Sequence, residues 1–64
     1  MYNIGDKVII RTDLMNGDDF GMVGWIDEMN EFLGKTMTVT KVFGEDSYEL
    51  DNIEEWEFAS DMFE

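Results

Sequence analysis

The alternation of apolar and polar residues along the chain predicts several short β-strands. The segments that show this period of two are residues 7–12, 36–43, 47–51 and 56–58. In the first of them, Val8 and Ile10 share one face, while Lys7, Ile9 and Arg11 share the other. The side chains that the alternation assigns to a common core are Val8, Ile10, Val39, Tyr48, Trp56 and Phe58.

One segment, residues 24–34, has the period of a helix instead. Trp25, Met29 and Phe32 fall at positions i, i+4 and i+7, and Gly34 is placed to end the helix. Residues 13–22 are rich in Asn, Asp and Gly and predict a long first loop. Near the end of the chain, Ser60 is predicted to cap a last helical turn.

These elements predict a mainly β fold, a small antiparallel barrel of the SH3-like kind with one short helix. The alternative is an α+β fold, in which the helix covers a sheet of three to five antiparallel strands. A chain of 64 residues has room for one small domain, residues 1–64. No apolar run approaches the length of a membrane span or a signal segment, which leads us to expect a cytoplasmic protein.

Charge changes this picture more than composition does. The net charge is −12, nine of the sixteen acidic residues fall in the last twenty positions, and no basic residue follows Lys41. The region after Lys41 contains five aromatic residues, which distinguishes it from a disordered acidic tail. Such a surface repels nucleic acid and membranes, so neither is expected as a direct partner. We expect the partner to be a basic, nucleic-acid-binding protein.

Several short motifs resemble those of a group of short phage and prophage proteins. The motifs are Gly5-Asp6-Lys7-Val8, Arg11-Thr12-Asp13-Leu14, Asp27-Glu28-Met29, Gly34-Lys35-Thr36-Met37-Thr38-Val39, Tyr48-Glu49-Leu50, Trp56-Glu57-Phe58 and Asp61-Met62-Phe63-Glu64. They cover most of the chain outside residues 16–23. The resemblance implies a small SH3-like barrel and a phage origin. That origin favours an inhibitor of a host enzyme or defence system, such as the acidic anti-CRISPR proteins that imitate DNA.

The carboxylates of the C-terminal part are the candidate binding residues. If Tyr48, Leu50, Trp56 and Phe58 point inward, then Glu49, Asp51, Glu55 and Glu57 point outward. Neighbours on one face of a strand lie about 6.7 Å apart, similar to successive phosphates of a nucleic-acid strand. The predicted partner-binding residues are Glu45, Asp46, Glu49, Asp51, Glu54, Glu55 and Glu57, with Trp25 or Met22 as an apolar anchor. The competing interpretation is an acidic surface that only maintains solubility.

Other kinds of site find little support in the sequence. Without cysteine or histidine there is no disulfide framework and no zinc site of the usual type. Asp13, Asn16, Asp18 and Asp19 lack the spacing of an EF-hand calcium loop. Because no nucleophile with a partner base is visible, we expect neither an enzyme nor a cofactor.

Two functions are consistent with these observations. The first is a phage-encoded inhibitor that imitates nucleic acid and occupies the basic DNA-binding groove of a host defence nuclease of the CRISPR type. The second is a non-catalytic adaptor that binds a peptide between the first loop and the sheet. In the adaptor, the aromatic residues Tyr48, Trp56 and Phe58 would form the contact surface, although in so small a domain such residues more often form the core.

Overall fold

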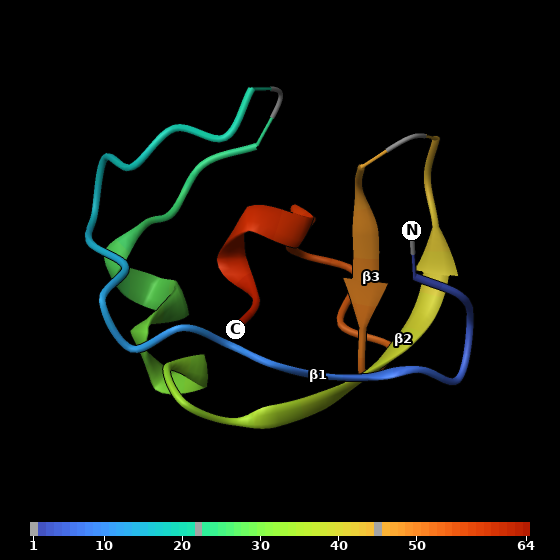
Figure 1. The fold of residues 1–64 in the computed structure, drawn as a ribbon. Helices are drawn as coiled ribbons and strands as arrows, with labels where there is room; N and C mark the ends of the chain where they lie inside the picture. The colour runs from blue at the N-terminus through green and yellow to red at the C-terminus, as the bar shows by residue number, and fades with distance from the viewer. Residues whose placement is uncertain (1, 22, 45) are drawn as a thin grey trace.

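Three antiparallel strands form the sheet of the computed structural model, in the order β1-β2-β3 (Figure 1). The structure describes residues 2–21, 23–44 and 46–64. The strands are β1 (Lys7–Ile9), β2 (Thr36–Val42) and β3 (Tyr48–Leu50). The prediction of a mainly β fold is confirmed, although the first and third strands are shorter than the sequence suggested.

Buried and more exposed side chains alternate along β1 and along most of β2, as predicted. Val8 is buried between the exposed Lys7 and Ile9, and it pairs with Met37, which is buried as well. The register between β2 and β3 shifts at one point, because Val39 pairs with Leu50 whereas Lys41 pairs with Glu49. Thr40 is therefore the extra residue of a β-bulge, which locally changes the direction of the strand.

The predicted helix is present only as a short 3-10 helix, η1 (Asp27–Phe32). Its apolar face is as expected, since Trp25, Met29 and Phe32 are all buried. Gly34 follows with a φ of +76°, a left-handed conformation that glycine adopts without strain. The tighter 3-10 geometry lets this six-residue segment turn the chain into β2 without a regular α-helix.

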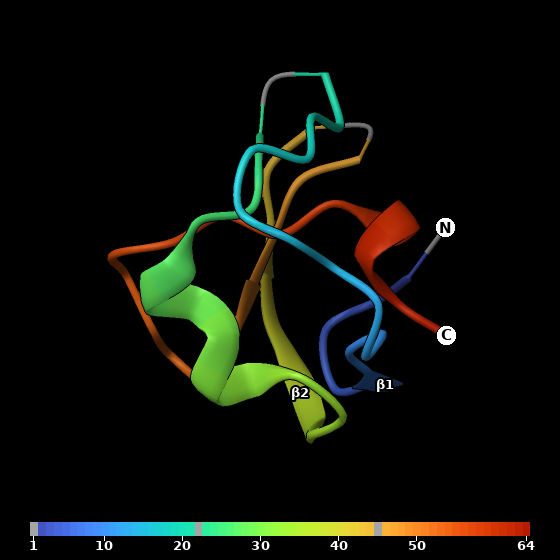
Figure 2. The same ribbon diagram turned by 90° about the vertical axis from the view of Figure 1, so that its left-hand side faces the viewer.

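The long first loop folds back on itself, and its two halves form hydrogen bonds with each other. Asp19 and Gly24 form an antiparallel bridge, and the Phe20 N–H donates to the Val23 carbonyl (2.8 Å). Closer to its base, the Trp25 N–H donates to the Asp18 carbonyl (2.9 Å). The loop thus has the backbone pairing of an irregular hairpin, which extends away from the sheet (Figures 1 and 2).

The C-terminal segment touches both edges of the sheet. Phe58 forms a bridge to Tyr48 of β3, and Phe63 forms a bridge to Ile10, just beyond β1. Between the two lies a second 3-10 helix, η2 (Ser60–Met62), whose N-cap is Ala59 without a side-chain cap, so the predicted capping by Ser60 is wrong. The predicted strand at 56–58 is reduced to the single bridge at Phe58. Because these contacts are single residue pairs, the SH3-like barrel stays a prediction.

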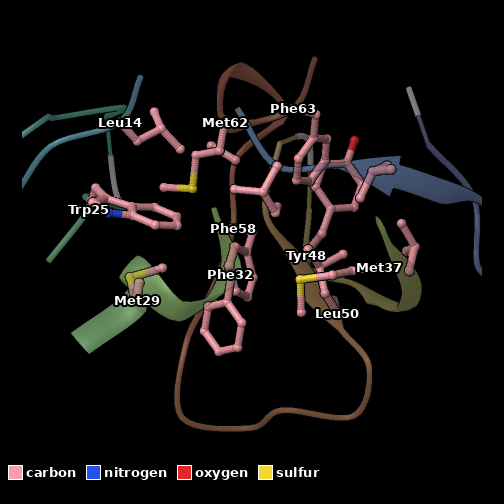
Figure 3. Close-up of a cluster of buried hydrophobic side chains, with 14 residues drawn as sticks. Leu14, Trp25, Met29, Phe32, Met37, Tyr48, Leu50, Phe58, Met62 and Phe63 are labelled. Atoms are coloured by element: carbon pink, nitrogen blue, oxygen red, sulfur yellow. The ribbon is translucent and has the colours of Figure 1, made fainter. Parts of the chain in front are cut away.

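The core lies between the sheet, η1 and the C-terminal segment (Figure 3). Phe32 of η1 meets Phe58 edge to face, with ring centroids 5.9 Å apart. Of the six predicted core residues, five are confirmed: Val8, Ile10, Val39, Tyr48 and Phe58. The sixth, Trp56, is only partly buried at the border of the core, so that prediction is wrong. Nowhere in the described chain is a helix both long and apolar enough to cross a membrane.

Candidate functional site

The candidate site is the surface around Trp56, where two pockets share three lining residues, Glu54, Trp56 and Glu57. One pocket, of about 240 Å³, reaches toward the sheet, and the other, of about 310 Å³, reaches toward the start of η1. We call them the sheet pocket and the helix pocket. Both combine an aromatic side chain with carboxylates, which is the combination that attracts an organic cation.

The sheet pocket lies over the outer face of β2 and β3. Its remaining lining residues are Lys41, Phe43, Glu49 and Ile53. Lys41 is the one basic residue in this set, and Glu49 is its partner in the register of the two strands. The pocket is therefore anionic on balance, with three glutamates around one lysine.

The helix pocket lies between the bend at residues 51–57 and the start of η1. Figure 2 shows this bend, in orange and red, passing beside the green helix. The lining residues apart from the shared three are Val23, Gly24, Ile26, Met29 and Glu55. Its wall is mainly apolar and its rim on the side of the bend is acidic.

Backbone conformation and two side-chain hydrogen bonds hold the bend in place. Asp51 and Asn52 both have positive φ angles, 52° and 61°, which Asp and Asn tolerate better than other residues with a side chain. Asp51 Oδ1 accepts a hydrogen bond from the Thr38 N–H (2.9 Å), and Thr40 Oγ1 accepts one from the Asn52 N–H (3.0 Å). The residues that follow are consequently presented at a fixed turn rather than on a free loop.

Glu49 does not point into solvent as predicted. Its side chain is only 5% exposed, and all three residues of β3 are buried. Glu49 lines the sheet pocket together with Ile53 and Trp56 of the bend, so this part of the chain lies near the face of β3 that the alternation assigned to solvent. Thr40 Oγ1 donates a hydrogen bond to Glu49 Oε2 (2.7 Å), which compensates part of the loss of hydration.

The other predicted carboxylates differ in how free they are. Asp46 accepts a hydrogen bond from the Ser60 N–H (3.3 Å), and Glu57 accepts one from the Ser47 hydroxyl. Glu54 and Glu55 are exposed, and among the described residues no hydrogen bond or ion pair reaches either side chain. Glu45, also predicted, lies outside the described residues. The free acidic positions are thus on the bend, not along the strand.

The predicted apolar anchor is not at the surface. Trp25 is 1% exposed, and its indole N–H donates to Asn30 Oδ1 (2.8 Å), so the prediction that it contacts a partner is wrong. Met22 lies outside the described residues. The aromatic residues that the surface offers to a partner include the 43% exposed Phe43 and the partly exposed Trp56, although the alternation had predicted Trp56 in the core. The run Glu-Glu-Trp-Glu at 54–57 was the signal for it, since a tryptophan between three acids rarely enters an apolar core.

A third pocket, of about 440 Å³, lies on the first loop. Its lining residues are Asn16, Gly17, Asp18, Asp19, Gly24, Trp25 and Ile26, none of them in β1, β2 or β3. Of the aromatics that the adaptor hypothesis would use, Tyr48 and Phe58 are buried. A peptide groove between the first loop and the sheet finds no support in this arrangement.

The described residues give no indication of a metal site. Within residues 2–21, 23–44 and 46–64, no group of three or more Asp or Glu side chains is arranged to hold a metal ion. The chemistry that the Trp56 surface offers is the binding of a positively charged group by an aromatic ring and nearby carboxylates. Comparison of the chain with protein-family models, with curated proteins and with solved structures gives no match.

Proposed function

We propose that this chain is a non-catalytic, phage-encoded inhibitor that binds a basic nucleic-acid-binding protein of the host. The most concrete target is a nuclease of a CRISPR defence system in the host cytoplasm. The inhibitor occupies the positively charged groove of this enzyme and competes with DNA there. The observation that carries the proposal is the exposed pair Glu54 and Glu55, to which no described residue forms a hydrogen bond or ion pair, beside the partly exposed Trp56.

The charge of the chain supports the approach to such a partner. With a net charge of −12 on 64 residues, attraction to a basic groove is long-ranged and raises the rate of association. The same charge disfavours direct binding to DNA or RNA. Charge by itself gives little specificity, so a defined contact surface is also required.

The Trp56 surface supplies that contact. Interfaces depend on a few aromatic and charged residues in well-packed positions, and Trp is among the most frequent of them. Here the ring is held by the fixed bend, with Glu54, Glu55 and Glu57 around it. Of the carboxylates in the sequence-based hypothesis, the exposed ones of the bend therefore take the main part in this contact, and Trp56 replaces Trp25 as its aromatic residue.

The experiment compares two variants that change the net charge equally. The first replaces Glu54, Glu55 and Glu57 by Gln, and the second replaces Asp27 by Asn and Glu28 and Glu31 by Gln on the exposed side of η1. Each is checked for folding by thermal denaturation and then assayed for displacement of DNA from a CRISPR nuclease. We expect the bend variant to inhibit about tenfold less than the parent, a difference of about 1.4 kcal/mol, and the η1 variant to lose much less.

The outcomes separate the interpretations. Equal losses in both variants would mean that only the total charge matters and would contradict a contact at the bend. Full inhibition by the bend variant would show that the acidic surface only maintains solubility. Raising the salt concentration is expected to slow association of the parent more than that of the bend variant.

A further inference from the structure

The sheet pocket contains a carboxylate whose charge the described chain does not balance. Glu49 is only 5% exposed. Of its two carboxylate oxygens, only Oε2 accepts a hydrogen bond among the described residues, from the Thr40 hydroxyl. In the described part of the chain no ion pair reaches this carboxylate. Every fully buried polar side-chain atom in the described residues has a hydrogen-bond partner, so Oε1, which has none, keeps some contact with solvent, and Glu49 lines the sheet pocket.

A buried carboxylate is normally paired with a cation or with several donors, since its desolvation is unfavourable. The nearest candidate in the chain is Lys41, opposite Glu49 in the register, but Lys41 is exposed and forms no ion pair with it. An external cation would therefore complete the site. This burial is an observation independent of the free acids on the bend.

The walls of the pocket select the kind of cation. Trp56 and the 43% exposed Phe43 offer aromatic surface, and Ile53 offers aliphatic surface. A metal ion needs several oxygen ligands around it, whereas part of this lining is apolar and no group of three or more Asp or Glu side chains in the described residues is arranged to hold a metal ion. A planar guanidinium suits both the apolar and the acidic lining, because it stacks on aromatic rings and forms paired hydrogen bonds with carboxylates.

The volume of the pocket also limits its occupant. At about 240 Å³ it is smaller than the roughly 300–1,000 Å³ of typical small-molecule sites. One long side chain fills such a space, with its stem along Ile53 and its charged end near Glu49. The glutamates that line the pocket exclude an anion.

We propose that the sheet pocket binds one arginine side chain of the basic partner, between Trp56 and the carboxylates of Glu49 and Glu57. The inference rests on the proposed function for the source of this arginine, but the pocket can be tested without the enzyme. Lys41 is the one like charge that lines the pocket, and it opposes the incoming cation.

The two tryptophans give a direct measurement. In the folded, ¹⁵N-labelled protein, the indole N–H of Trp56 reports on the pocket, and that of the buried Trp25 serves as an internal control. The probe is an amidated glycine peptide with one central arginine, and its control carries citrulline, which has the same shape without the charge. At low ionic strength we expect the Trp56 signal to shift with an affinity in roughly the millimolar range, while the Trp25 signal stays in place.

Three variants sharpen the titration. Replacing Glu54 and Glu57 by Gln is expected to weaken binding about fivefold, whereas replacing Glu28 and Glu31 by Gln, with the same change of net charge, should alter it less than about twofold. Lys41→Gln is expected to strengthen binding about two- to fivefold, because a like charge leaves the pocket. An effect of Lys41→Gln in the opposite direction would contradict a cation site.

Equal shifts with the arginine and citrulline peptides, or movement of the Trp25 signal to the same degree, would overturn the inference. These results are distinct from failure of the proposed function. If the arginine peptide does not bind to the sheet pocket but the bend variant still loses inhibition, only the pocket proposal is refuted. If the arginine peptide binds to the sheet pocket but the protein displaces no DNA from the nuclease, only the proposed target is refuted.

Discussion

The two tryptophans lie in regions with opposite surroundings. Trp25 is enclosed by Leu14, Met29 and Met62 in the core (Figure 3), and its indole N–H has an internal acceptor. Trp56 is partly exposed, borders two pockets and has glutamates before and after it in the chain. Trp25 therefore contributes to the packing of the core, whereas Trp56 is positioned by the chain around it and stays accessible.

The acidic residues divide in the same way. Four aspartates in the first third of the chain each accept a hydrogen bond from a nearby residue, and they are Asp6, Asp13, Asp18 and Asp19. Short carboxylates of this kind stabilise turns by bonding to the local backbone. Glu54 and Glu55 have no such bond among the described residues. Negative charge is therefore spread over the molecule. The described carboxylates without a hydrogen bond include Asp27, Glu28 and Glu31 on η1, and Glu54 and Glu55 are the two that lie beside Trp56.

The largest expected difference between the two regions is in stability. Trp25→Ala should lower the free energy of unfolding by about 3–5 kcal/mol, since it removes a fully enclosed aromatic side chain. Trp56→Ala should lower it by about 1–2 kcal/mol, because that side chain is only partly buried, at the border of the core. Urea denaturation of both variants measures the difference. Equal losses would mean that Trp56 belongs to the core and would remove the basis for a contact surface there.

Much of the fold could be predicted from the sequence because the core-facing positions follow local periods. Val8, Ile10 and Val39 alternate along strands, and Met29 and Phe32 follow the helical spacing. These patterns depend only on neighbouring residues. The prediction of Ser60 as a cap failed because η2 begins at Ser60 itself, with Ala59 as the N-cap, and the Ser60 N–H donates to Asp46 Oδ1, 14 residues away.

The site was harder to predict because it depends on contacts between distant segments. Glu49 lines one pocket with Ile53 and Trp56, which follow the turn at Asp51, and alternation within one strand does not reveal such neighbours. The error at Trp56 has a related cause. Of residues 56–58, only Phe58 forms a bridge to β3, so the two residues before it do not follow the alternation of a strand.

An intermediate effect is expected at the hydrogen bond that holds Glu49. Thr40→Val removes the donor to Glu49 Oε2 and the acceptor of the Asn52 N–H, and should lower the free energy of unfolding by about 2–3 kcal/mol. Thr40→Ser keeps the hydroxyl and should lose less than about 1 kcal/mol. Glu54→Gln, at a free carboxylate, should stay within about 0.5 kcal/mol of the parent. If Thr40→Val were as stable as Thr40→Ser, Glu49 would not depend on this bond, and its burial would need another explanation.

The smallest expected effect concerns the ion pair of Arg11 and Asp13, and its dependence on pH distinguishes it from the free acids. Arg11 Nε and Nη2 donate to the two oxygens of Asp13 (2.9 Å each), while Nη1 donates to the Asp61 carbonyl (2.7 Å). The hydrogen bond from Arg11 lowers the pKa of Asp13 below its usual 3.8, and the same bond raises the pKa of Arg11.

A lowered pKa means that the pair stabilises the fold above about pH 4, and that this contribution is lost as the pH falls through the pKa of the folded state. Asp13→Asn should therefore reduce the melting temperature slightly near neutral pH, and this difference should disappear once the pH lies below the folded-state pKa of Asp13, where the carboxyl group is protonated in both states. Glu55→Gln should do the reverse near neutral pH and raise the melting temperature slightly, because it removes repulsion without removing a bond. A rise for Asp13→Asn as well would show that its ion pair contributes nothing, and that the distinction between bound and free carboxylates does not extend to the first loop.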